Sequence, residues 1–172
     1  ITIDAREHDI SKIVTSETVL PKARMSMNAS VVGTKVYLFC GSDEQINPTD
    51  TITVYDTKTD KIVTSPTVLP YVLEYAAVSS VGTKIYLFGG TSKTAGVINT
   101  IHIYDTETDE IITSSTVLPQ KLDSISAESI GTKIYLFGGF NNGSVNTIYI
   151  YDTENDTITP SSAVLPSDDS GL

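Results

Sequence analysis

Cysteine, histidine and tryptophan are scarce in this 172-residue sequence, which contains one cysteine, two histidines and no tryptophan. A single cysteine excludes an internal disulfide framework and any zinc site built from several cysteines, and it leaves the redox compartment open. A copper centre with several imidazole ligands would need more histidines than these. Disulfide-stapled domains and cysteine-rich metal proteins are therefore excluded as classes.

Basic residues are also few, because 11 lysines and arginines accompany 21 acidic residues and the formal charge is −10. Such a chain repels phosphate backbones and anionic lipid, so we expect neither nucleic acid nor a membrane surface as its partner. No apolar run approaches the roughly 18 residues of a membrane span, and no signal segment is visible. The sequence starts at Ile1 rather than Met. We therefore expect a processed or excised piece that is soluble and either cytoplasmic or secreted.

What the sequence has in abundance is repetition. Three short motifs recur with a period of 49 residues, which shortens to 47 at the last step of two of them. They are Gly-Thr-Lys at 33, 82 and 131, Val-Leu-Pro at 19, 68, 117 and 164, and Tyr-Asp-Thr at 55, 104 and 151. Three independent markers with a common period indicate an array of similar units that bury their apolar faces against one another.

Each unit reads as four short strands, and the second unit illustrates the pattern. Its strands are predicted at residues 75–81, 84–88, 100–104 and 110–114, with a variable loop at 91–99. Gly82-Thr83 between the first two strands has the length of a tight hairpin turn. No segment shows a helical period, so the sequence predicts an all-β protein of antiparallel strands.

These units resemble the kelch repeat. The resemblance rests on the strand Lys-Ile-Tyr-Leu-Phe-Gly-Gly at 84–90, the loop that follows it and the Tyr-Asp-Thr corner at 104–106. It implies β-propeller blades of four antiparallel strands. Some positions depart from the family pattern: isoleucine replaces its outer tryptophan at 62, 111 and 158, leucine replaces its lead-in arginine at 73 and 122, and Cys40 replaces the first glycine of the pair.

The repeat divides the chain into three full blades and a fragment. Residues 1–20 are predicted to be a partial blade of two strands, 21–69, 70–118 and 119–166 to be kelch blades 1 to 3, and 167–172 to be a polar tail. Propellers close with about four to eight blades, so a ring is incomplete in one chain. We expect either that the chain belongs to a longer polypeptide or that it self-associates as a homodimer or larger homo-oligomer. An open stack of blades in a fibre is a third arrangement.

Residues that recur in every unit are explained by the blade itself, so functional residues are sought where the copies differ. The variable loops lie at 42–50, 91–99 and 140–146, and connectors follow each Val-Leu-Pro. The kelch resemblance implies that these two sets form one binding face. An exposed aromatic side chain there can anchor a partner, although it can also merely fill a connector. The predicted binding residues are Arg24, Tyr71, Glu74, Asp123, Phe140 and Asn141.

The acidic corners at 105–109 and 152–156 place carboxylates at positions 1, 3 and 5, as calcium loops do. The glycine at position 6 and the glutamate at position 12 are absent, and the first unit has Lys58 where an acid is needed. We therefore predict hairpin turns whose Asp and Thr side chains bond nearby backbone, and no metal site.

These observations favour a non-catalytic protein-interaction or scaffold module that takes another protein or peptide as its partner and needs no cofactor. Two alternatives stay open. The first is a fragment of a kelch-type oxidase or sugar-modifying enzyme, although His8 and His102 show no spacing relation and Cys40 is predicted to be a buried small residue. The second is a cell-surface carbohydrate-binding propeller, in which Tyr71 and Phe140 would stack on sugar. No catalytic residue is predicted.

Overall fold

The computed structural model describes residues 16–45 and 47–166, and these form fifteen β-strands and no helix. Three antiparallel sheets of four strands, here called blades 1 to 3, contain most of them. Blade 1 comprises β1 (Asn28–Val32), β2 (Lys35–Phe39), β3 (Thr51–Asp56) and β4 (Lys61–Val68). Blade 2 comprises β6 (Ala77–Val81), β7 (Lys84–Phe88), β10 (Thr100–Asp105) and β11 (Glu110–Val117). Blade 3 comprises β12 (Ser126–Ile130), β13 (Lys133–Phe137), β14 (Thr147–Asp152) and β15 (Thr157–Val164).

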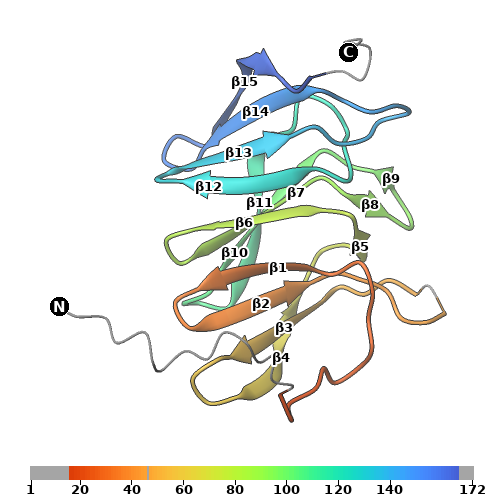
Figure 1. Cartoon of the computed structure of the whole chain (residues 1–172), viewed down its shortest axis with the longest axis vertical. Helices are drawn as coiled ribbons and strands as arrows, with labels where there is room; N and C mark the ends of the chain where they lie inside the picture. The colour runs from red at the N-terminus through yellow and green to blue at the C-terminus, as the bar shows by residue number, and fades with distance from the viewer. Residues whose placement is uncertain (1–15, 46, 167–172) are drawn as a thin grey trace, which may run out of the picture.

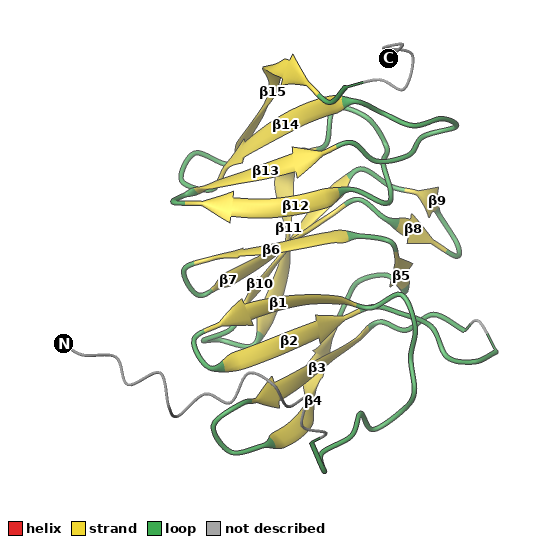
Figure 2. Ribbon diagram, in the orientation of Figure 1, coloured by secondary structure: helices red, strands yellow, loops and turns green. Residues whose placement is uncertain are grey.

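The blades stack in chain order, from blade 1 at the bottom of Figure 1 to blade 3 at the top, with β1, β6 and β12 as neighbouring inner strands. The predicted all-β class and the four-stranded blade are confirmed. Figure 2 shows that the three sheets do not close into a ring. In the described part of the chain there is no helix that could cross a membrane. Most of the predicted two-stranded partial blade at 1–20, and all of the tail at 167–172, lie outside the described residues.

Tight hairpins join the first two strands of each blade. In blade 2, Val81 pairs with Lys84 across the turn, so that Gly82 and Thr83 form the two-residue connection. Gly82 has a φ of 61°, a left-handed conformation that glycine adopts without steric penalty. The equivalent glycines at 33 and 131 have nearly the same φ. The Gly-Thr-Lys motif therefore fixes the register of every blade.

The start of blade 2 differs from the predicted strand at 75–81. Tyr75 has a φ of 57°, which breaks the extended chain, so the first strand of the blade, β6, begins only at Ala77. The residues just before the break form β5 (Leu73–Glu74), which pairs with β8 (Thr91–Ser92). Together with β9 (Gly96–Val97) they make a small three-stranded sheet within what was predicted to be a connector and a loop.

The apolar core lies between successive blades. Tyr37 and Phe39 of blade 1 are buried and place their rings edge-on to Tyr104 of blade 2, with centroids 5.8 Å away in both cases. At the next interface, Tyr151 of blade 3 contacts Phe88 of blade 2 edge-on, with ring centroids 5.4 Å apart, and Tyr86 in a tilted arrangement at 5.6 Å. The prediction that these tyrosines and phenylalanines pack between blades is confirmed for the two interfaces present.

Polar contacts repeat across the same interfaces. An Asp in the turn between the third and fourth strands accepts a hydrogen bond from a Tyr of its own blade and another from a Ser that lies 42 to 44 residues earlier in the chain. The backbone carbonyl of the Asp accepts a further hydrogen bond from a Thr two residues after that Ser. We call this arrangement the latch. Its members are Tyr55, Asp60, Ser16 and Thr18 at blade 1, Tyr104, Asp109, Ser65 and Thr67 at blade 2, and Tyr151, Asp156, Ser114 and Thr116 at blade 3.

Candidate functional site

The connectors and the variable loops meet at one end of the strands, at the right of Figure 1, which we call the loop face. Each connector pairs with the variable loop of its own blade. Met25 bridges Ser42 in blade 1, Glu74 pairs with Thr91 in blade 2, and Asp123 bridges Phe140 in blade 3. The backbone hydrogen bonds of the Met25–Ser42 and Asp123–Phe140 bridges range from 2.9 to 3.2 Å. The two loop sets are thus physically joined, and the backbone is held by pairing that the sequence pattern did not reveal.

The six predicted binding residues all belong to this end of the molecule. Tyr71 is 40% exposed and Phe140 is 49% exposed, while Asn141 is exposed beside Phe140. The remaining three, Arg24, Glu74 and Asp123, are half-buried. The structure brings Asp123, Phe140 and Asn141 together in blade 3, whereas Arg24 belongs to blade 1 and lines a small separate hollow with Met25 and Asp43.

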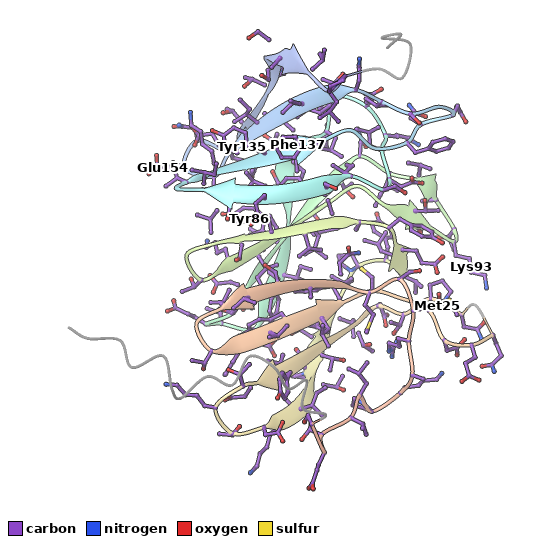
Figure 3. All side chains as sticks on the ribbon, viewed as in Figure 1. Met25, Tyr86, Lys93, Tyr135, Phe137 and Glu154 are labelled. Atoms are coloured by element: carbon purple, nitrogen blue, oxygen red, sulfur yellow. The ribbon has the colours of Figure 1, made fainter. Side chains whose placement is uncertain are left out.

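A larger hollow of about 380 Å³ lies where the loops of blades 1 and 2 meet. Its walls come from the variable loop of blade 1, the connector between the blades and the variable loop of blade 2. The lining residues are Asn47, Pro48, Pro70, Tyr71, Val72, Ser92, Lys93 and Thr94. Tyr71 is the one predicted residue among them. Figure 3 places Lys93, which the sequence reasoning missed, at the edge of this face together with Met25.

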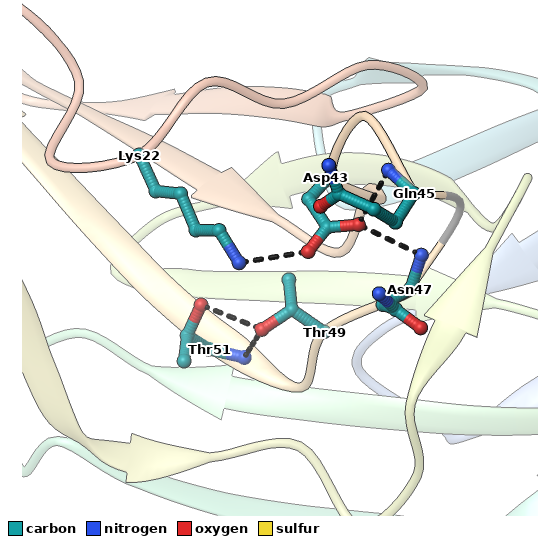
Figure 4. A network of polar contacts seen from close by, with 6 residues as sticks. All are labelled: Lys22, Asp43, Gln45, Asn47, Thr49 and Thr51. Carbon is teal, nitrogen blue, oxygen red and sulfur yellow. Dashed lines mark hydrogen bonds and ion pairs between the residues drawn. The ribbon is translucent and has the colours of Figure 1, made fainter.

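An ion pair supports the blade 1 side of the loop face. Lys22 Nζ lies 2.7 Å from Asp43 Oδ2, and the other carboxylate oxygen accepts 3.0 Å hydrogen bonds from the amides of Gln45 and Asn47 (Figure 4). The hydrogen bond from Lys22, followed by the amide of Asn47, lowers the pKa of Asp43 to about 2. Asp43 is therefore ionised at neutral pH and holds the loop in a fixed turn. Neither Lys22 nor Asp43 was among the predicted site residues.

The connector of blade 3 is tied to blade 2. One carboxylate oxygen of Asp123 accepts a 2.8 Å hydrogen bond from Thr91, and the other accepts one from the hydroxyl of Ser124. The amide of Ser124 in turn donates to the carbonyl of Tyr75, at 2.9 Å. Asp123 therefore joins the loops of neighbouring blades, and the exposed aromatic rings of Tyr75 and Phe140 project from a rigid base.

The side chains that could act as a nucleophile, a base or a metal ligand are hydrogen-bonded or buried. His102 is only 1% exposed, its ring nitrogens contact the hydroxyls of Thr100 and Thr113, and burial lowers its pKa. Burial also raises the pKa of Cys40 to about 12, which disfavours the reactive thiolate. His8 lies outside the described residues. Within the described ranges, no three His, Cys, Asp or Glu residues are grouped as metal ligands.

The acidic corners make the local hydrogen bonds that the sequence predicted. Asp105 Oδ1 accepts the amide of Glu107, and Asp152 accepts the amides of Glu154 and Asn155. Thr106 donates from its hydroxyl to the carbonyl of Thr83, which ties the corner to the neighbouring hairpin of the same blade. The fifth residue of each corner, Asp109 or Asp156, is the latch aspartate. Its carboxylate accepts the hydroxyl of Tyr104 or Tyr151 and is not directed at the other carboxylates of the corner.

Comparison with known proteins gives one match over most of the chain. The family model described as "KLHDC2/KLHL20/DRC7 Kelch-repeats domain" matches residues 1–160. No curated protein shows significant similarity to the chain. The match thus covers blades 1 and 2 in full and blade 3 as far as its last strand, β15.

Proposed function

Since this chain belongs to the kelch-repeat family, whose domains bind other proteins, we propose that it is a non-catalytic interaction module that binds a peptide or an extended protein segment on its loop face. One observation carries the proposal. Four large apolar side chains, from all three blades, are exposed by 40 to 49% on that face, and they are Met25, Tyr71, Tyr75 and Phe140. Exposed aromatic and methionine side chains on a rigid base are typical anchors of protein interfaces.

The hollow beside Tyr71 suggests the chemistry of the bound segment. Two prolines, Pro48 and Pro70, and the ring of Tyr71 offer apolar walls, and Lys93 supplies a positive charge on the rim of an otherwise acidic protein. A volume of about 380 Å³ accommodates one or two side chains of a peptide. We propose an apolar or aromatic anchor residue next to an acidic one.

The absence of catalysis is part of the proposal. It is supported by the burial of Cys40 and His102, whose side chains are 2 and 1% exposed and are therefore closed to a substrate. His102 lies behind Tyr71, with ring centroids 5.9 Å apart, and does not itself line the hollow. The carboxylates of the latches are engaged by Tyr and Ser hydroxyls. The loop face offers binding surface rather than an activated group.

We further propose that the module acts as part of a complete propeller, whose remaining blades come from a second copy of the chain or from further blades of one longer polypeptide. The support is that blades 1 and 3 each have one face without a neighbouring blade among the described residues. Repeats of this kind need neighbours on both sides to bury their apolar surface.

The binding proposal is tested by selecting a random-peptide phage library on the immobilised chain. Peptides that bind are expected to lose at least about tenfold in affinity on Tyr71→Ala, because a buried aromatic anchor contributes more than about 1.4 kcal/mol. Arg24→Glu and Phe140→Ala map the extent of the face. Ile112→Ala is the matched control, since Ile112 is 58% exposed near the opposite, hairpin end of the strands.

The contrary result is equally specific. Selected peptides that bind the Tyr71, Arg24 and Phe140 variants as well as wild type, but lose affinity on Ile112→Ala, would move the binding site away from the loop face. Selection of no binding peptide at all would count against a peptide-binding role.

A further inference from the structure

The two outer faces of the three-blade stack carry the same kinds of residue as the two sides of the internal interfaces. On blade 1, the residues that face away from blade 2 are Val36, Leu38, Tyr55 and Ile62, and all are half-buried. One repeat later, three of the four equivalents, Ile85, Leu87 and Tyr104, are 0 to 2% exposed, because the Tyr and Phe of the preceding blade cover them. The fourth, Ile111, is half-buried. The outer face of blade 1 is therefore a surface that this fold covers wherever a preceding blade is present.

A hollow of about 320 Å³ marks the missing contact on blade 1. Its floor is formed by Val36, Leu38, Tyr55 and Ile62, and its rim by Ser16, Thr18 and Leu20. At the next interface, Phe39 and Leu69 occupy the corresponding space and are 0 and 2% exposed. On blade 1 the rim segment supplies Leu20, the equivalent of Leu69, but no described residue supplies the aromatic pair.

Blade 3 carries that aromatic pair, and no residue in the described ranges covers it. Tyr135 and Phe137 on β13 are half-buried, whereas the equivalent Tyr86 and Phe88 are 4 and 0% exposed. Figure 3 shows Tyr135 and Phe137 on blade 3 and Tyr86 at the covered interface below. The outer face of blade 3 thus exposes an aromatic pair. The outer face of blade 1 has an apolar hollow at the position where each internal interface holds such a pair.

The polar residues of the latch also correspond between the two outer faces. Ser161 occupies the position of Ser65 and Ser114, and its hydroxyl makes the same local bond, here with the amide of Ala163 at 3.1 Å. Ala163 itself replaces the latch threonine. On blade 1 the latch acceptor, Asp60, is bonded by the chain's own Ser16 and Thr18. A blade that docked on blade 1 in the internal geometry would bring Ser161 to the place of Ser16.

We propose that blade 3 of one copy docks head-to-tail on blade 1 of a second copy, with Tyr135 and Phe137 filling the hollow and with residues 161–165 replacing the second copy's Ser16–Leu20 at the latch. This rests on the self-association in the proposed function and names its surfaces. The occupant is a second copy because the same apolar and polar groups already form this interface twice within the chain. Two copies supply six blades, a number within the range in which propellers close.

The chain's own segment Ser16–Leu20 and the incoming residues 161–165 differ in the hydrogen bonds that they offer to Asp60. The segment Ser16–Leu20 belongs to the same chain and offers two hydroxyls to Asp60, whereas the incoming segment offers only Ser161. The incoming blade compensates by burying two aromatic rings that the segment lacks. The Ala163→Thr substitution would restore the third latch hydroxyl and is expected to tighten each of the two blade 3–blade 1 contacts of a closed ring by about fivefold, the effect of one hydrogen bond.

Light scattering after size exclusion measures the assembly. The wild-type chain is expected to show twice its 18.5 kDa mass, and Phe137→Asp and Leu38→Asp are expected each to show 18.5 kDa. Mixed in equal amounts, the two variants should form a 1:1 heterodimer, because each supplies the intact face that the other lacks. Val63→Asp on the outer strand, where Val63 is 60% exposed, is the control that should remain dimeric.

Several results would overturn the docking. The first is that wild type and Ala163→Thr both have the mass of one chain. The second is that Phe137→Asp is still a dimer. The third is that a mixture of the two folded variants stays monomeric. Circular dichroism confirms that each variant is folded, and Tyr135→Glu replaces Phe137→Asp if the latter does not fold. Peptide binding on the loop face is measured separately with Tyr71→Ala, so loss of either proposal leaves the other interpretable.

Discussion

The hydroxyl of Ser65, at the end of blade 1, donates a 2.7 Å hydrogen bond to the carboxylate of Asp109 in the corner of blade 2. The same carboxylate oxygen accepts the hydroxyl of Tyr104, and Thr67 donates to the backbone carbonyl of Asp109. The corner aspartate is thus bonded within its own blade and to the preceding one. The arrangement recurs at Asp60 and Asp156, so the repeat encodes a polar interface as well as an apolar one.

Replacement of the latch carboxylate is expected to destabilise the protein. Asp109→Ala removes the acceptor for both Tyr104, which is buried, and Ser65, which is half-buried. Loss of hydrogen bonds to a charged group should lower the free energy of unfolding by about 2–3 kcal/mol. Urea denaturation followed by circular dichroism measures this. Glu107→Ala, in the same turn but exposed, is the matched control, and an equal loss in both variants would contradict a role for the latch.

The latches also predict a pH dependence with two limbs. Hydrogen bonds from Tyr55 and Ser16 lower the pKa of Asp60 below its ordinary 3.8. Burial raises the pKa of Tyr151 above 10.0, and the bond to Asp156 adds to this. The contribution of Asp60 is therefore present above pH 3.8 and is lost as pH falls further, whereas the contribution of Tyr151 is present below pH 10 and is lost as pH rises above it.

The measurement is the free energy of unfolding across pH, with a plateau expected through the neutral range. Tyr151→Phe should reduce the slope of the alkaline limb and leave the acid limb in place. An alkaline limb that is unchanged in this variant would show that the raised pKa of Tyr151 does not contribute to stability.

Two glycines of blade 2 separate the effect of backbone conformation from that of close packing. Gly82 and Gly89 both have positive φ, 61° and 58°, but an added Cβ meets nothing within 4 Å at Gly82, whereas at Gly89 it clashes with the carbonyl of Leu122. Gly82→Ala should destabilise by about 1–2 kcal/mol from the left-handed conformation alone. Gly89→Ala should destabilise clearly more, because the connector of blade 3 must move. Thermal melts of the two variants compare them, and equal shifts would contradict this reading.

Cys40 stands at the position of Gly89 in blade 1 and has a φ of 63°. Its side chain is 2% exposed, and burial followed by the charge of Glu74 raises its thiol pKa to about 12. The native protein should therefore react with a disulfide reagent many times more slowly than the urea-unfolded chain at pH 8. Equal rates in the two states would show that Cys40 is accessible.

The blades could be predicted from the sequence because their determinants are local and repeated. Alternating Tyr and Phe on the second strand and a two-residue turn at Gly82 specify a hairpin, and in blade 2 both faces of that strand are buried. The latch escaped prediction because Ser65 and Asp109 lie on different blades, 44 positions apart, and each residue alone looks like an ordinary strand end or turn. A comparison of both residues at every repeat could have exposed the pairing.

The candidate site was only partly accessible to sequence reasoning. Tyr71 and Phe140 stood out as aromatics outside the repeat, and both are exposed on the loop face. Lys93 and Pro48 carry no periodic signal, since the loops that hold them differ in every copy, and only the fold brings them beside Tyr71. Asp123 was predicted as a binding residue, and the structure shows a further role for it. Its carboxylate accepts hydrogen bonds from Thr91 and Ser124 and so stabilises the loop face.

Binding on the loop face is the central claim, and nuclear magnetic resonance tests it most directly. A selected peptide is titrated into the ¹⁵N-labelled chain, and the amide shifts are mapped. The predicted result is shift changes at Tyr71, Ser92 and Lys93, which line the hollow, with the latch corners at 57–60, 106–109 and 153–156 unaffected. Shift changes confined to those corners, at the opposite end of the strands, would contradict it.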